Sequence, residues 1–91
     1  MKMIMLTETD ECTINNFISD CEHLSAGEVA ELEIGNTEVT VVKDGDYEEL
    51  FDVITSEDGA PVDDELAVHA FDLSEIVFGS FEKTRPFGLI A

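Results

Sequence analysis

Cationic side chains are scarce in this chain. Its 91 residues include only four Lys and Arg against 22 Asp and Glu, which gives a formal net charge of −18. Nucleic-acid binding depends on cations that neutralise phosphates, and anionic lipid repels an acidic surface. The composition therefore argues against direct nucleic-acid binding and against a membrane role.

Cysteine and long apolar runs are also scarce. The two cysteines, Cys12 and Cys21, are nine residues apart, which on one continuous helix is ~13 Å along the axis and too far for a disulfide. No apolar run approaches the length of a membrane-spanning helix, and the start MKMIMLTETD lacks the apolar region of a secretory signal. We therefore expect a cytoplasmic protein with reduced thiols.

Apolar residues are nevertheless plentiful enough for folding. The chain is 44% hydrophobic, which places it outside the class whose low hydrophobicity keeps it disordered. Its length predicts one compact acidic domain that spans residues 1–91. We expect an α+β fold in which one main N-terminal helix packs on a mostly antiparallel β-sheet.

The first half of the chain has clear periodicities. A short strand is expected over 2–6, and a helix over 9–23 with Thr7 or Thr9 as its cap. Residues 28–43 alternate apolar and polar positions on either side of Gly35-Asn36, which predicts a β-hairpin with one apolar and one acidic face.

The second half is ambiguous. For 46–55 we expect a short helix or turn that passes into a strand at 51–55, followed by a loop at SEDGAP. Residues 63–82 fit both periods: Leu66, Ala70, Leu73 and Val77 suit a helix, whereas Leu66, Val68, Ala70 and the run EIVFGSF suit strands. We favour strands for part of this segment because Val, Phe and Ile dominate it. An extended tail is expected from Arg85 onward.

The most acidic stretch of the chain also contains apolar residues. DYEELFDVITSEDGAPVDDE, residues 46–65, holds nine carboxylates and no Lys or Arg, yet it includes Leu50, Phe51, Val53 and Ile54. Such a hydrophobic set places the acids on a folded scaffold rather than a disordered tail. The predicted partner-binding residues are the acids of the middle segment and of the polar hairpin face: Asp44, Asp46, Glu48, Glu49, Asp52, Glu57, Asp58, Asp63, Asp64, Glu65, Glu31, Glu33 and Glu38.

Motifs for metal binding or catalysis are missing from these acids. The segment from Asp44 has Glu49 where a calcium-binding EF-hand loop needs Gly, and Thr55 where it needs Glu. Cys21 and His23 are close in sequence, but positions i and i+2 of a helix do not face each other. We therefore expect no metal, no cofactor, no catalytic residues and no enzymatic activity.

Three interpretations of the acidic surface stay open. It keeps the chain soluble, it adapts a small domain to high salt, or its carboxylates imitate phosphates. We favour the third, in which rigidly held acids bind a basic nucleic-acid-binding protein by electrostatic complementarity. The alternative is an acidic protein–protein interaction module that docks through an apolar patch such as Phe78, Phe81 and Phe87. We predict no particular oligomeric state.

In size and composition the chain resembles the nucleic-acid-mimicking inhibitors that phages and mobile elements use against host defence and repair proteins. The likeness lies in a short, compact, strongly acidic sequence without an active-site motif, and it assigns no role to a single residue. It implies an anti-restriction or anti-CRISPR inhibitor, or one directed at a nuclease, that occupies the DNA- or RNA-binding cleft of its target in the host cytoplasm.

Overall fold

The computed structural model describes residues 7–82. In chain order its elements are α1 (Glu8–Cys21), β1 (Val29–Ile34), β2 (Thr37–Lys43), β3 (Leu50–Glu57), β4 (Ala60–His69) and α2 (Ala70–Glu82). The predicted strand at 2–6 and the tail from Arg85 lie outside the described residues. The α+β prediction is confirmed, with the difference that two helices of similar length, and not one, pack on the sheet.

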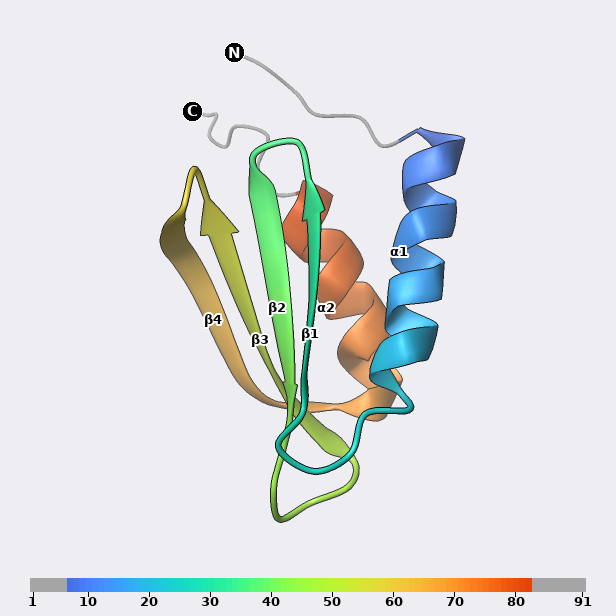
Figure 1. Ribbon diagram of the computed structural model, residues 1–91, viewed down its shortest axis with the longest axis vertical. Helices are drawn as coiled ribbons and strands as arrows, with labels where there is room; N and C mark the ends of the chain where they lie inside the picture. Colours follow the sequence, from blue (N-terminus) through green and yellow to red (C-terminus); the bar gives the residue numbers. More distant parts are fainter. Residues whose placement is uncertain (1–6, 83–91) are drawn as a thin grey trace.

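The four strands form an antiparallel sheet in the order β1-β2-β3-β4 (Figure 1). Both helices cover the same face: α1 contacts β1 and α2, whereas α2 crosses β2, β3 and β4. No helix of residues 7–82 lies over the opposite face of the sheet (Figure 1). This arrangement divides the sheet into a buried side and an uncovered side.

Helix α1 begins and ends nearly where the sequence predicts. The Thr7 hydroxyl accepts a hydrogen bond from the Asp10 backbone N–H at 3.0 Å, and the Asp10 carboxylate accepts one from the Thr7 N–H at 3.2 Å. This reciprocal capping box satisfies two of the free N–H groups at the start of the helix. Asp10 and two further acids also lie in the first turn, where the helix dipole favours negative charge.

The two hairpins end in short turns at the same end of the molecule (Figure 1). Gly35-Asn36 joins β1 to β2 as predicted, with Gly35 at φ 64°. Asp58 and Gly59 have φ of 53° and 83°, the two positive values of a type I′ hairpin turn. The expected SEDGAP loop is therefore a two-residue turn, and the strand predicted at 51–55 extends from Leu50 to Glu57.

The ambiguous segment is a strand up to His69 and helix α2 from Ala70, so the run EIVFGSF, which also suited strands, is helical. Leu73, Val77 and Phe81 follow at intervals of four residues and are all buried, which is the pattern of one helix face. The His69 Nδ1 accepts the Phe71 backbone N–H at 3.1 Å and so caps the first turn. Packing of this face against the sheet outweighs the strand preference of Val, Ile and Phe.

The core lies between the sheet and the two helices. Buried side chains alternate along β2 and β3, where every second residue points toward the helices. Its apolar members are Ile14, Phe17, Ile18, Cys21, Val39, Val41, Phe51, Val53, Val68, Leu73, Val77 and Phe81.

Leu73→Ala is expected to lower the free energy of unfolding by about 2–5 kcal/mol, because Leu73 is fully buried and its truncation leaves a cavity. The neighbouring exposed Ser74→Ala serves as the matched control and should change stability by less than about 0.5 kcal/mol. Urea denaturation followed by circular dichroism measures both. Equal effects would contradict the helical packing of this segment.

Candidate functional site

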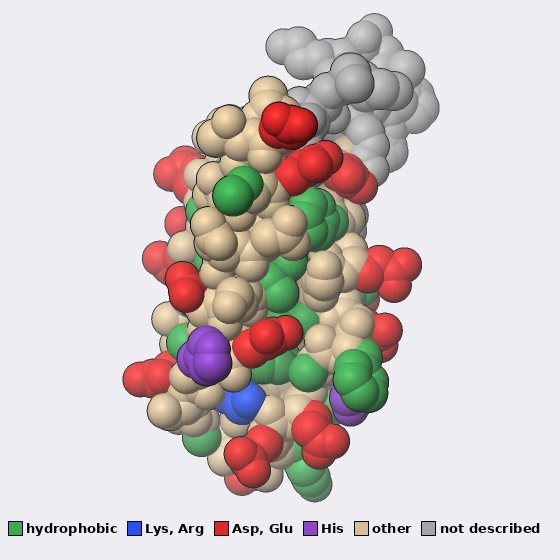
Figure 2. All heavy atoms as spheres, turned by 90° about the vertical axis from the view of Figure 1, so that its right-hand side faces the viewer, with side chains coloured by type: hydrophobic (Ala, Val, Ile, Leu, Met, Phe, Trp, Pro, Cys, Tyr) green, Lys and Arg blue, Asp and Glu red, His purple; other side chains and the backbone are tan. Residues whose placement is uncertain are grey.

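The described part of the chain is almost entirely anionic. Residues 7–82 contain all 22 carboxylates of the sequence, and Lys43 is the one Lys or Arg among them. The view onto the side of α1 shows acidic side chains along the whole length of the molecule and a single cationic one (Figure 2). Its surface potential is therefore set by carboxylates with few fixed counter-charges.

Lys43 is withdrawn from this surface. Its side chain is only 9% exposed, its ammonium donates to the backbone carbonyl of Glu48, and its Nζ lies 4.6 Å from the centre of the Phe51 ring. Among the described residues Lys43 forms no ion pair with a carboxylate, since the ion pair found there joins His69 and Glu49 at 3.7 Å. Lys43 thus acts as a structural cation that holds the β2–β3 loop.

The uncovered face of the sheet carries an array of acids. Strand alternation and register place five of them there, on the side opposite to the core: Glu31, Glu33, Glu38, Asp52 and Asp64. With strands ~4.8 Å apart and alternate residues ~6.8 Å apart, β1 to β4 present these carboxylates over ~14 Å. Half-buried Val42 and Ile54 lie between them.

Two of these acids face each other directly. Glu33 on β1 is paired with Glu38 on β2, whereas Glu31 is paired with the neutral Thr40. Like charges directly opposite on neighbouring strands destabilise a sheet. Repulsion between Glu33 and Glu38 therefore lowers the free energy of unfolding of the isolated chain. A cation that lies between the two carboxylates reduces this repulsion.

The remaining predicted site residues are distributed over three other places. Asp44, Asp46, Glu48 and Glu49 lie at the β2–β3 loop, Glu57 and Asp58 at the opposite end, and Asp63 and Glu65 on the helix side of β4. The acidic run 46–65 is thus not brought together on one face. An antiparallel hairpin sends its two halves along opposite directions and alternates their side chains between both faces.

Three of the predicted acids are already engaged by the backbone or a neighbouring turn. Asp44 Oδ1 accepts the backbone N–H groups of Asp46 and Tyr47 at 2.7 and 3.0 Å. Asp52 Oδ1 accepts the N–H of Ala67 at 3.0 Å, and Asp58 Oδ1 accepts the side-chain amide of Asn36 at 3.3 Å. Besides carrying charge, Asp44 therefore stabilises the β2–β3 loop, Asp52 the irregularity of β4 at Ala67, and Asp58 the contact between the two hairpin turns.

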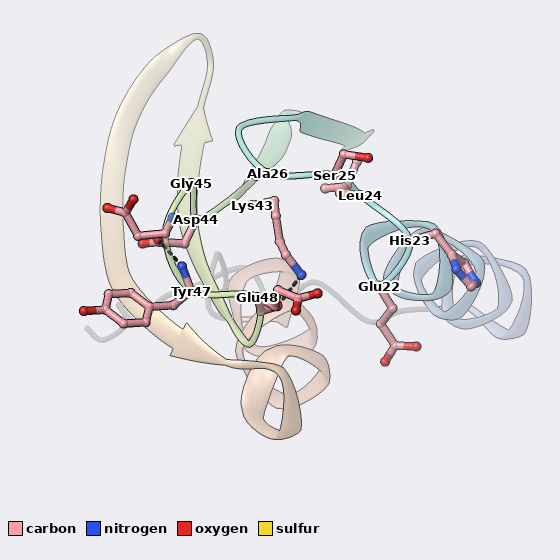
Figure 3. A pocket seen from close by; sticks show the side chains of 11 residues that line it. Glu22, His23, Leu24, Ser25, Ala26, Lys43, Asp44, Gly45, Tyr47 and Glu48 are labelled. Atoms are coloured by element: carbon pink, nitrogen blue, oxygen red, sulfur yellow. Dashed lines mark hydrogen bonds between the residues drawn. The ribbon is translucent and has the colours of Figure 1, made fainter.

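A hollow of about 400 Å³ opens between the β2–β3 loop and the segment that follows α1 (Figure 3). Lys43 points from β2 toward Glu48, and Glu22 and Asp44 line other parts of the hollow. Tyr47 stands at the outer side of the loop and is 64% exposed. Because the carboxylates outnumber the one ammonium, this hollow extends the anionic surface.

Metal binding and the reactivity of Cys21 can be assessed within residues 7–82. No group of three His, Cys, Asp or Glu able to hold a metal ion occurs within residues 7–82. Cys21 is buried, and this burial, together with the negative charges of Asp20 and Glu22, raises the pKa of its thiol from 9.0 to about 12. A neutral buried thiol is a poor nucleophile.

Two large apolar side chains of residues 7–82 that the sequence analysis did not assign to the surface are strongly exposed. Phe71, at the start of α2, is 91% exposed, and Leu66 on β4 is 67% exposed. Of the patch considered in the sequence, Phe81 is buried, Phe78 is half-buried and Phe87 lies outside the described residues. Aromatic residues in an ambiguous segment could not be assigned to core or surface before the helix was known.

Comparisons with known proteins return no relative: no family model, no curated protein and no solved structure matches the chain. Within residues 7–82, neither helix has the length and apolar character needed to cross a membrane.

The opposed Glu33 and Glu38 give a prediction about stability. Glu33→Gln should raise the free energy of unfolding at low salt by about 0.5 kcal/mol, because it removes the like-charge pair. Glu31→Gln is the matched control, on the same strand and face but opposite Thr40. Urea denaturation in low and high NaCl should show a gap between the variants that closes as salt screens the charges. A gap that persists at high salt would contradict the electrostatic explanation.

The raised pKa of Cys21 gives a prediction about pH. Above about pH 9 the unfolded thiol ionises while the folded thiol stays neutral, so the free energy of unfolding should fall between about pH 9 and 12, by up to ~1.4 kcal/mol per pH unit. This contribution is fully present below pH 9. Urea denaturation at several pH values should show a shallower fall for Cys21→Ala than for wild type. The exposed-thiol control Cys12→Ser should keep the wild-type slope, and an equal slope in Cys21→Ala would contradict the assignment.

Proposed function

We propose that this chain is an acidic inhibitor that imitates nucleic acid and occupies the DNA- or RNA-binding cleft of a basic protein. The observation that carries the proposal is the near absence of fixed counter-charge: all 22 carboxylates lie in the described part of the chain, and its one Lys is buried. The proposed target is a host defence or repair protein of the restriction, CRISPR or nuclease type, met in the host cytoplasm and inhibited without catalysis by this chain. The proposed source is a phage or mobile element.

The uncovered sheet face is the surface that we propose for contact. Its acids stand on strands whose backbones are fixed by the sheet, as in the Glu31–Thr40–Ile54–Asp64 row across all four strands. Groups positioned before binding lose little conformational freedom when a partner docks. Rigid carboxylates at strand spacing are therefore suited to a target whose cations are arranged for phosphates.

Electrostatics also supports a cationic target. A surface of one sign steers an oppositely charged partner and speeds association, and the same surface repels nucleic acid and anionic lipid. Cross-strand repulsion between Glu33 and Glu38 is relieved when a Lys or Arg of the target comes between them. Binding is therefore expected to weaken steeply with salt.

The proposal is tested by capture from host lysate followed by displacement. Tagged protein should retain basic nucleic-acid-binding proteins at low salt and release them at high salt or on addition of duplex DNA. The key variant neutralises four acids of the uncovered face (Glu31→Gln, Glu33→Gln, Glu38→Gln and Asp64→Asn). Four interfacial ion pairs at ~0.5 kcal/mol each predict a loss of affinity of about thirtyfold.

The matched control instead neutralises three acids on α1 and one at its C-cap: Glu8→Gln, Glu11→Gln, Asp20→Asn and Glu22→Gln. It removes the same net charge from the helical side of the molecule, so it should weaken capture far less. Retention that survives high salt and excess duplex DNA would contradict nucleic-acid mimicry. Equal losses in both variants would contradict the choice of face.

A further inference from the structure

A second hollow, of about 450 Å³, lies where β4 leads into α2 at the lower end of Figure 1. Its lining combines apolar and acidic side chains. Leu66 and Ile76 supply apolar surface, and Glu65, Asp72 and Glu75 supply exposed carboxylates. Asp72 and Glu75 are three residues apart on α2, so their Cβ atoms lie ~5–6 Å from each other on one face.

A strand irregularity shapes this hollow. The β3–β4 register shifts between Phe51 and Val53, and Ala67 has a φ of 56°, a left-handed conformation that costs a non-glycine residue energy. The Ala67 N–H is held by the Asp52 carboxylate. The bulge locally redirects β4 before it enters α2, and Leu66 next to it is left 67% exposed.

An exposed aromatic pair adjoins the hollow. The Phe71 ring is 91% exposed, and its centre lies 4.9 Å from that of the His69 ring, with the planes tilted by 32°. The Phe71 N–H bonds to His69 Nδ1, while His69 Nε2 faces Glu49. Both ring nitrogens of His69 thus have a partner, which fixes the orientation of the ring beside Phe71 at the start of α2.

We propose that this hollow binds an arginine side chain of the basic partner. The inference rests on the proposed function and names the residue type that the partner presents at this place. The aliphatic part of arginine fits against Leu66 and Ile76, and its planar guanidinium stacks on Phe71 while pairing with Asp72 and Glu75. The three carboxylates favour a cationic ligand, and residues 7–82 place no exposed Lys or Arg beside them.

Arginine is favoured over lysine by the shape of the site. The guanidinium forms paired hydrogen bonds with a carboxylate and stacks on aromatic rings, whereas the lysine ammonium is a strongly hydrated point charge. The electrostatic attraction is the same for both cations. A higher affinity for arginine than for lysine would therefore come from the aromatic and apolar side chains of the hollow and not from the net charge of the protein.

The test uses the full chain and two capped peptides of equal charge, hexaarginine and hexalysine, in isothermal titration calorimetry at low salt. Wild type should bind hexaarginine about two- to fivefold tighter than hexalysine, as stacking at an exposed aromatic predicts. Leu66→Ala/Phe71→Ala should reduce this ratio to one while keeping salt-sensitive binding of both peptides. Asp72→Asn/Glu75→Gln should lower hexaarginine affinity as well as the ratio.

Two controls keep the wild-type ratio if the inference is correct. Glu8→Gln/Glu11→Gln removes the same charge from α1, and Val29→Ala trims an apolar residue that is 52% exposed elsewhere. A ratio of one in wild type, or a wild-type ratio that survives in Leu66→Ala/Phe71→Ala, overturns the arginine site and leaves the proposed function standing. Failure of both peptides to bind overturns both proposals.

Discussion

The contact between one face of the sheet and two helices is the interaction on which the rest of this molecule depends. Repulsion among the carboxylates opposes compaction, and within residues 7–82 the one Lys, Lys43, is buried and pairs with no carboxylate. Burial of apolar surface must therefore supply the stability. Fully buried Ile14, Val39 and Leu73 each come from a different element, which ties α1, the sheet and α2 into one core.

Local patterns were enough to predict the first half of the fold. The apolar spacing of α1, its Thr7 cap and the Gly35-Asn36 turn are short-range signals, and each is realised close to the expected position. Helix α2 stayed ambiguous with strands because its residues have strand preferences and because its cap is His69, which is not among the usual capping residues. The Asp58-Gly59 turn, by contrast, carried a hairpin signal that the sequence reasoning passed over.

The candidate site was predictable only where it follows strand alternation. Glu31 and Glu33 lie on the uncovered face as the hairpin pattern requires. The acids of 46–65 were expected to act together because they are neighbours in sequence, yet the β3–β4 hairpin separates them by direction and by face. The exposure of Phe71 depends on the junction between β4 and α2, a tertiary feature that composition does not encode.

The two outer strands show a further consequence of this charge. Within residues 7–82, β1 and β4 each pair with one neighbour, so each leaves a row of backbone groups unpaired in the sheet. The outer strand β1 carries the acids Glu31 and Glu33. The outer strand β4 has Pro61, which lacks a backbone N–H, near its start, and register shifts interrupt its pairing with β3. Charged, proline-bearing and bulged edges resist the addition of further strands. In a chain whose inner strands are apolar, such edges disfavour the strand-on-strand addition by which amyloid-like stacks grow.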